Sequence, residues 1–163
     1  MYIIAFAAGV GLAGCTVGDT TEGGKTMKAS SAVTGFMGGT VTGTGSFEEG
    51  ASGQPTDSVT LTLTISGCVA GKMYPAHIHQ GSECTDTTTQ GGHWDMTRGE
   101  GIPLVACSTT TGTVTYTRPA TDPTTAWSVG GDATTNVIGH LIVIHDPDTT
   151  TMRIGCGKIA AAN

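Results

Sequence analysis

The chain has 163 residues, enough for one domain with a real core and too few for two comfortable ones. Its 26 glycines, its many threonines and its 12% of charged residues favour strands and turns over helices. The formal net charge of −6, with only 7 Lys and Arg in total, excludes nucleic acid as a partner, because phosphate binding requires clustered basic side chains.

The first fourteen residues are apolar or small, and they end at Leu12-Ala13-Gly14-Cys15 ahead of a polar stretch. This resembles a bacterial lipoprotein signal, which implies a signal peptide over residues 1–14 and a lipid anchor to the membrane on Cys15. The implied location is the bacterial cell envelope, periplasmic or outer-surface. No Lys or Arg precedes the apolar run, and the alternative is an ordinary buried N-terminal segment.

Residues 15–31 are polar and lack an apolar period, so we expect a flexible tether there and a folded all-β domain over residues 32–163. The segment from Val59 to Ile65 alternates apolar and polar residues with strict period two, which predicts a strand with one buried face. Further strands are predicted at residues 41–47, 113–117 and 137–144. Short strands with Gly-rich turns and no helical period indicate a sandwich or flattened barrel. The pattern does not place residues 117–136, which hold Trp127.

Histidines supply the sharpest local signal. His77 and His79 are two residues apart, so on a strand both rings point to one side while the residue between them points into the core. The Gly-, Ser-, Thr- and Asp-rich loop that follows can fold back and bring His93 to the same ion. His145 ends an apolar run, where we expect a sheet edge. His140 faces the other side of a continuous strand, and we interpret it as structural or surface.

Four of the five histidines then share one role, and neutral imidazole suits copper, zinc, iron or nickel. Five cysteines leave one unpaired in an exported protein, and lipidation of Cys15 accounts for it. The remaining even set suits an oxidising compartment, and the sequence alone permits three pairings of its members. These are Cys68, Cys84, Cys107 and Cys156.

Four segments resemble, in order and approximate spacing, the copper/zinc superoxide dismutases. They are Ala76-His77-Ile78-His79-Gln80-Gly81, Gly92-His93-Trp94, the run from Val137 to His145, and Arg153-Ile154-Gly155-Cys156-Gly157. The resemblance spans about residues 32–159 and implies a Greek-key β-sandwich or flattened barrel. It implies one copper ion with four ligands, which are His77, His79, His93 and His145.

The resemblance also implies that Arg153 guides the anionic substrate and that Cys84 and Cys156 form a disulfide. We expect Cys68 and Cys107 to form a second disulfide closing one end of the barrel; the alternative is two buried free thiols.

The chain departs from the zinc-containing family in two places. The loop from Trp94 to Pro103 holds no histidine, so a closed four-coordinate zinc site cannot be built and we expect no zinc. Only residues 146–152 separate His145 from Arg153, where the family carries a long steering loop. Both losses resemble the copper-only branch, in which a Glu holds the ring of the bridging-type histidine. Glu100 is the candidate, with a simple turn residue as the alternative.

The leading hypothesis is copper-dependent dismutation of superoxide to oxygen and hydrogen peroxide, with catalytic roles for Arg153 and His93. Arg153 docks the anion, and release of His93 from the ion suits the lower coordination of Cu(I). The main alternative is a periplasmic copper-binding or copper-delivery protein with the same ligands and no turnover. A third interpretation is a structural β-sandwich with incidental histidines. The sequence does not indicate an oligomeric state.

Overall fold

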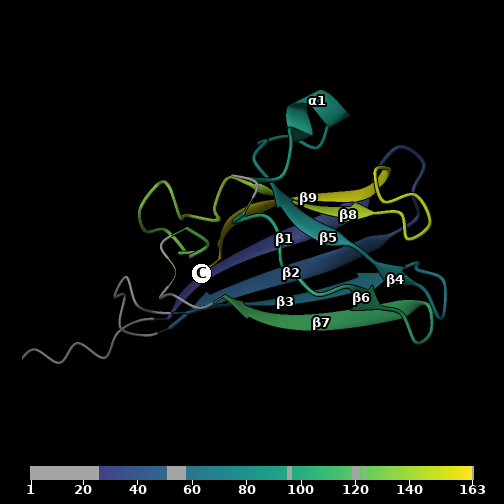
Figure 1. Cartoon of the computed structure of the whole chain (residues 1–163), viewed down its shortest axis with the longest axis horizontal. Helices are drawn as coiled ribbons and strands as arrows, with labels where there is room; N and C mark the ends of the chain where they lie inside the picture. Colours follow the sequence, from purple (N-terminus) through teal and green to yellow (C-terminus); the bar gives the residue numbers. More distant parts are fainter. Residues whose placement is uncertain (1–25, 51–57, 95–96, 119–121, 123, 163) are drawn as a thin grey trace, which may run out of the picture.

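The structure of the chain, a computed structural model, describes residues 26–50, 58–94, 97–118, 122 and 124–162. Its elements are β1 (Met27–Gly35), β2 (Thr42–Glu49), β3 (Val59–Ser66), β4 (Met73–Tyr74), β5 (Ala76–His79), α1 (Thr87–Gln90), β6 (Val105–Ala106), β7 (Thr111–Arg118), β8 (Leu141–His145) and β9 (Arg153–Ala162). The predicted all-β class is confirmed, because α1, with four residues, is the only α-helix among the described residues (Figure 1).

The strand predicted from strict alternation is β3. Val59, Leu61, Leu63 and Ile65 are fully buried, while the threonines between them lie on the outer face. The outer threonines pair across strands: Thr60 and Thr64 of β3 each lie 3.0 Å, hydroxyl to hydroxyl, from a threonine of β7. Threonine suits this face because it combines high strand propensity with a polar group.

Seven strands form one antiparallel sheet in the order β5-β8-β9-β1-β2-β3-β7, and β4 pairs with β6 separately. The chain leaves β3, crosses to β5 at the opposite end of this order, returns to β7 beside β3, and crosses again to β8. These crossings are of the Greek-key type. Figure 1 shows the sheet curled into a half-barrel, with α1 projecting beyond β5 and β9.

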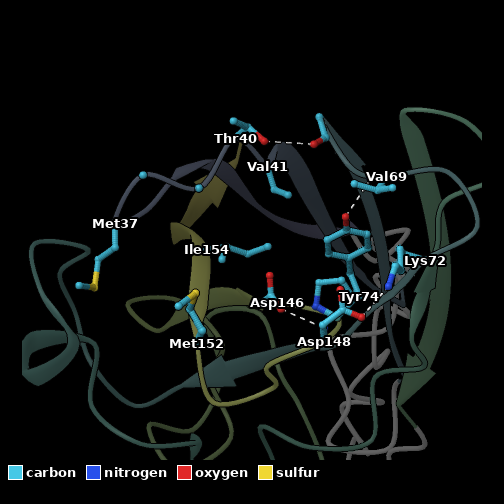
Figure 2. Close-up of a pocket in the computed structure, with 14 residues that line it drawn as sticks. Met37, Thr40, Val41, Val69, Lys72, Tyr74, Asp146, Asp148, Met152 and Ile154 are labelled. Carbon is cyan, nitrogen blue, oxygen red and sulfur yellow. Dashed lines mark hydrogen bonds and ion pairs between the residues drawn. The ribbon is translucent and has the colours of Figure 1, made fainter.

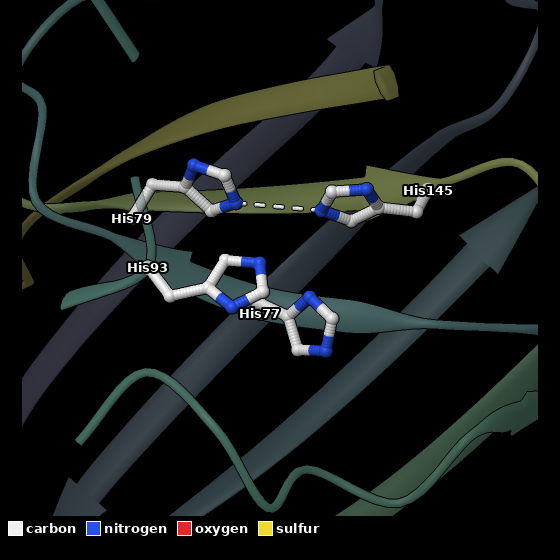
Figure 3. Close-up of side chains that lie close together, drawn as sticks. All are labelled: His77, His79, His93 and His145. Atoms are coloured by element: carbon white, nitrogen blue, oxygen red, sulfur yellow. Dashed lines mark hydrogen bonds between the residues drawn. The ribbon is translucent and has the colours of Figure 1, made fainter. Parts of the chain in front are cut away.

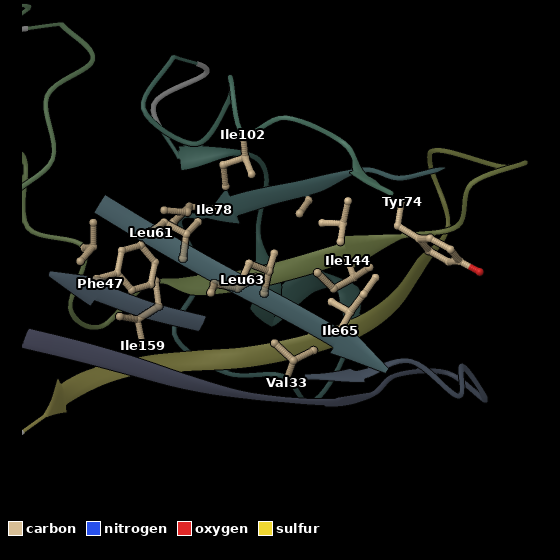
Figure 4. Close-up of a cluster of buried hydrophobic side chains, with 14 of the residues drawn as sticks. Val33, Phe47, Leu61, Leu63, Ile65, Tyr74, Ile78, Ile102, Ile144 and Ile159 are labelled. Carbon is tan, nitrogen blue, oxygen red and sulfur yellow. The ribbon is translucent and has the colours of Figure 1, made fainter. Parts of the chain in front are cut away.

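The curled sheet encloses one main apolar core. Figure 4 shows side chains from β1, β2, β3, β5, β8 and β9 meeting there. Phe47 and Leu61 are fully buried, and the ring of Trp127 packs edge-on against Phe47 with 5.8 Å between ring centroids. Trp127 therefore anchors part of the unplaced 117–136 stretch to the core.

The strands expected over residues 41–47 and 113–117 are β2 and β7, each with slightly different ends, and the sheet begins earlier in the chain than expected. β1 begins at Met27, so residues 27–31 belong to the sheet and not to the tether. Ala29 and Ser31 face inward here, and such small side chains give no apolar signal although the strand pairs with β2 and β9 on its two sides. Residues 1–25 lie outside the described residues, and they include the predicted signal peptide and Cys15.

The strand expected over residues 137–144 is shorter. It begins at Leu141, because Gly139 adopts a φ of +97° in a turn and Val137 is buried in the core without being in the strand. β8 has β5 and β9 on its two sides, so His145 ends an inner strand and not an edge strand. In the part of the chain that the structure describes, no helix has the length and apolar character to cross a membrane.

Two cystine bridges tie distant segments together. Cys84 and Cys156 have their Cα atoms 5.7 Å apart, and Cys68 and Cys107 have theirs 6.4 Å apart, each pair with its sulfurs at bonding distance. These are the pairs expected from the sequence. The first joins the loop after β5 to β9, and the second lies by the small β4-β6 sheet.

Candidate metal centre

The four predicted histidines come from three segments that the topology brings together. His77 and His79 lie on β5, which pairs with β8, and His145 is the last residue of β8. The loop after β5 folds back so that the backbones of His93 and His79 form an isolated antiparallel β-bridge. A backbone hydrogen bond from Gln80 N to Gly92 O at 3.0 Å supports this arrangement. The residue between the first two histidines, Ile78, is fully buried in the core as expected.

Their rings converge on one space (Figure 3). One nitrogen of each histidine lies within 4.8 Å of the corresponding atoms of the others. His79 Nε2 and His145 Nε2 are 3.3 Å apart. Two nitrogens bound to one ion at about 2.0 Å are themselves about 3 Å apart at angles near tetrahedral or square, so this spacing suits shared coordination. The cluster can therefore hold a metal ion.

For three of the four rings, neighbouring groups select which nitrogen faces that space. His79 Nδ1 donates to the carbonyl of Gly91 at 3.0 Å, which leaves Nε2 with its lone pair. His93 Nδ1 contacts the Glu100 carboxylate, which likewise leaves Nε2. His77 Nε2 lies 3.3 Å from the other carboxylate oxygen of Glu100, and its buried Nδ1 has no hydrogen-bond partner among the described residues. A buried nitrogen without a partner is costly unless something binds it.

Burial keeps the inner pair of rings neutral. It lowers the pKa of His79 to about 3 and the pKa of His145 to about 4, in each case chiefly by desolvation, with the Arg153 charge nearby acting in the same direction. Desolvation also lowers the pKa of His77, and the charge of His93 adds to this effect. Neutral imidazole is the form that binds metals, so these rings are ready to act as ligands near neutral pH.

Glu100 lies where the copper-only resemblance places it and contacts one ring more than expected. Its two oxygens face His93 Nδ1 and His77 Nε2, so a single carboxylate supports two candidate ligands. Both rings keep some exposure, 20% for the His77 side chain and 26% for that of His93. His79 and His145 are almost completely buried, which makes the His77 and His93 side the accessible side of the cluster.

Arg153 lies beside the cluster at the start of β9, paired across the sheet with His145. Its guanidinium donates to the carbonyls of Thr87 and Gly91, both at 2.8 Å, and to the Gln90 side chain at 3.2 Å. These bonds use three of its five N–H donors. Because the Gly91 carbonyl also accepts from His79, one backbone oxygen ties the guanidinium to a candidate ligand.

His140 takes no part in the cluster. Its ring stacks on Trp94 with 4.1 Å between centroids and an angle of 28°, and it lies in the turn before β8. The expected structural role therefore fits the contacts, although the reason given for it, a continuous strand, does not hold.

Several residues that organise the centre carried no recognisable sequence signal. Gln90 is fully buried, and its side-chain oxygen accepts a hydrogen bond from Arg153. The carbonyl of Gly91 accepts from both Arg153 and His79. Arg118 and Trp127 hold the turn that carries Glu100, through side-chain bonds to backbone carbonyls.

A separate pocket of about 350 Å³ opens at one end of the barrel (Figure 2). Two methionines, Met37 and Met152, line it together with the ion pair of Lys72 and Asp148, whose Nζ and Oδ1 are 2.6 Å apart. Its lining includes Asp146, the residue that follows His145, and none of the four histidines. The histidine cluster is thus distinct from this pocket.

In comparisons with known proteins, no family model matches the chain and a search of curated proteins gives no significant match. What the chain does is therefore inferred from the geometry of its own residues.

Proposed function

We propose that this protein binds one copper ion at His77, His79, His93 and His145 and dismutates superoxide, in the manner of the copper-only enzymes that its motifs resemble. One observation carries the proposal: four imidazole nitrogens lie within 4.8 Å of one another, and the guanidinium of Arg153 shares the Gly91 carbonyl with Nδ1 of His79. Metal storage requires only the four histidines and not the arginine. An anion-docking cation beside the ligands favours an anionic substrate.

The donor set favours copper. Four neutral imidazoles, without a thiolate or carboxylate among them, suit Cu(II) in a tetragonal field. Copper bound there supplies a one-electron Cu(II)/Cu(I) couple for the balanced reaction 2 O₂•⁻ + 2 H⁺ → O₂ + H₂O₂. Glu100 holds Nδ1 of His93, the side of the ring that would face zinc in the zinc-containing family, which supports a single-metal centre.

His93 is the ligand suited to change during turnover. It is the more exposed of the two accessible rings, and it is delivered by a loop rather than a sheet strand. With Nδ1 held by Glu100, Nε2 of His93 is the atom that would hold the copper, and it is also the ring atom that would carry a proton toward the peroxide product.

Arg153 docks superoxide through the N–H donors that its three protein bonds leave open. Those bonds fix the plane of the guanidinium, and a pre-oriented donor loses less entropy when it binds an anion. Because the net charge of −6 repels anions at long range, this local cation has to supply the attraction.

The proposed setting is the cell envelope, with a lipid on Cys15. Two cystine bridges agree with an oxidising compartment. Mass spectrometry of membrane-fraction protein tests this, with a lipid-modified Cys15 at the N-terminus as the expected result.

The enzymatic proposal is tested with copper-loaded protein and its Arg153→Ala variant. Loss of one charge-assisted hydrogen bond to the substrate corresponds to about 1.5–3 kcal/mol, so kcat/KM for superoxide should fall about tenfold to a hundredfold. Lys158→Ala is the matched control, because Lys158 is an exposed cation on the same strand whose side chain pairs with Glu83.

Activity no greater than that of free copper ions, or full activity in Arg153→Ala, would overturn the proposal. Copper binding at the four histidines without turnover would instead support the copper-binding or copper-delivery alternative.

A further inference from the structure

Glu100 reaches two rings because the turn that carries it is pressed against β5. The amide of Ile78 donates to the carbonyl of Gly99 at 3.0 Å, and a Cβ on Gly99 would collide with the carbonyl of Ile78. Only glycine allows this approach of turn and strand. The short contact between Glu100 and the ligand rings thus depends on where residues 97–100 lie.

Arg118 holds that turn from the far side. Its side chain is 6% exposed, and its Nη2 donates to the carbonyls of Thr97 at 3.2 Å, Arg98 at 2.7 Å and Glu100 at 2.7 Å. Gly101, with a φ of +82°, brings the backbone so close that a Cβ there would lie 3.4 Å from Arg118 Nη1. One guanidinium therefore collects three carbonyls of a single turn.

Two aromatic side chains pack against the guanidinium of Arg118. Its carbon lies 4.9 Å from the ring centroid of Trp127 and 5.6 Å from that of Tyr116. Trp127 Nε1 also donates to the Arg98 carbonyl at 2.7 Å, so two donors meet at one oxygen. Burying a cation is costly, and the three carbonyls and two aromatic faces around Arg118 offset that cost.

We infer that Arg118, assisted by Trp127, is a positioning residue for the metal centre: it sets the turn so that the Glu100 carboxylate orients both His77 and His93. The inference rests on the metal site of the proposed function but not on its catalytic activity. It assigns a purpose to Trp127, which the sequence pattern could not place.

A double-mutant cycle tests it, with the Cu(II) affinity of the otherwise intact chain measured by chelator competition. Arg118→Gln should weaken Cu(II) binding about tenfold to a hundredfold, the range found when partners of metal ligands are removed. In a Glu100→Gln background the same change should have almost no further effect, because Arg118 acts through Glu100. Thr115→Ala, at an exposed site on the same strand, is the control.

A second readout does not depend on copper. In metal-free protein, the ¹⁵N chemical shifts of the His93 and His77 rings report the Glu100 contacts, and Arg118→Gln should move them only while Glu100 is present. Trp127→Phe, which removes the Nε1 donor and keeps an aromatic ring, should move them in the same direction by a smaller amount, and it provides a test if Arg118→Gln unfolds.

Equal effects of Arg118→Gln in both backgrounds, or unchanged ring shifts in both Arg118→Gln and Trp127→Phe, would overturn the inference. A chain that shows the expected ring shifts but binds no Cu(II) would support the positioning role and overturn the proposed copper site.

Discussion

Individual contacts decide which atom His77, His79 and His93 present. His79 shows this most clearly, since its Nδ1 is committed to the Gly91 carbonyl and its Nε2 is therefore left for a metal. The carboxylate of Glu100 does the same for two rings at once. These contacts lie outside any local motif, yet they set the tautomers on which metal binding depends.

The buried rings make the metal-free protein sensitive to acid. The folded-state pKa values of His79 and His145, about 3 and about 4, lie below the ordinary value near 6.5, so the unfolded chain binds more protons between these limits. Their contribution to stability is complete above about pH 6.5 and is lost as the pH falls toward 4, at about 1.4 kcal/mol per pH unit for each ring.

Urea denaturation of metal-free protein between pH 7 and 4.5 measures this slope. A His79→Gln/His145→Gln double variant should lose most of it, since glutamine does not titrate. Equal slopes in the two proteins would show that the rings are not the cause.

Single elements place these groups. β5 supplies two candidate ligands on one face, β8 supplies one at its end, and the loop containing α1 returns to bring in His93 and to hold Arg153. The bridge between Cys84 and Cys156 fastens that loop to β9, three residues after Arg153. The bridge therefore limits how far the loop can separate from the strand.

Removing this bridge should have two effects. The Cys84→Ser/Cys156→Ser variant should lose roughly 4 kcal/mol of unfolding free energy, because the bridge closes a long loop, with 72 residues of sequence separation. It should also bind Cu(II) more weakly, because His93 is then less well placed.

The other bridge is the matched control. Cys68→Ser/Cys107→Ser, with a separation of 39, should lose a similar amount of stability by chemical denaturation while the folded protein keeps its Cu(II) affinity. Equal affinity losses in the two variants would contradict the proposed role of the loop.

The whole molecule brings together groups that lie far apart in the chain. The Greek-key crossings set β5, β8 and β9 side by side, which joins residues 77–79 to residues 145 and 153. The core beneath them, drawn in Figure 4, provides the rigid support, since close-packed interiors resist displacement.

Truncating that core should destabilise the protein in proportion to burial. Leu63→Ala removes a fully buried side chain from the centre of β3 and should cost about 2–5 kcal/mol of unfolding free energy. Thr62→Ala changes its exposed neighbour and should cost less than about 1 kcal/mol. Chemical denaturation compares the two, and similar losses would argue against the assigned faces of β3.

The sequence by itself determined the features that depend on local periodicity. Strict alternation identified β3 and its buried face, and the two-residue spacing of His77 and His79 placed both rings on one side of a strand, because backbone geometry alone dictates these relations. Periodicity did not predict the start of β1, because small residues form that inner strand through backbone pairing. It also wrongly included Val137 in a strand, because this apolar side chain is buried from a turn.

Only the tertiary structure decided what converges. The carboxylate of Glu100 spans two rings, and Arg118 reaches across from the end of β7 to hold its turn. Such contacts join residues whose positions depend on how the whole sheet curls. No local pattern of residues encodes the distance between Arg118 and the turn of Glu100, because it is set by the packing of many strands at once.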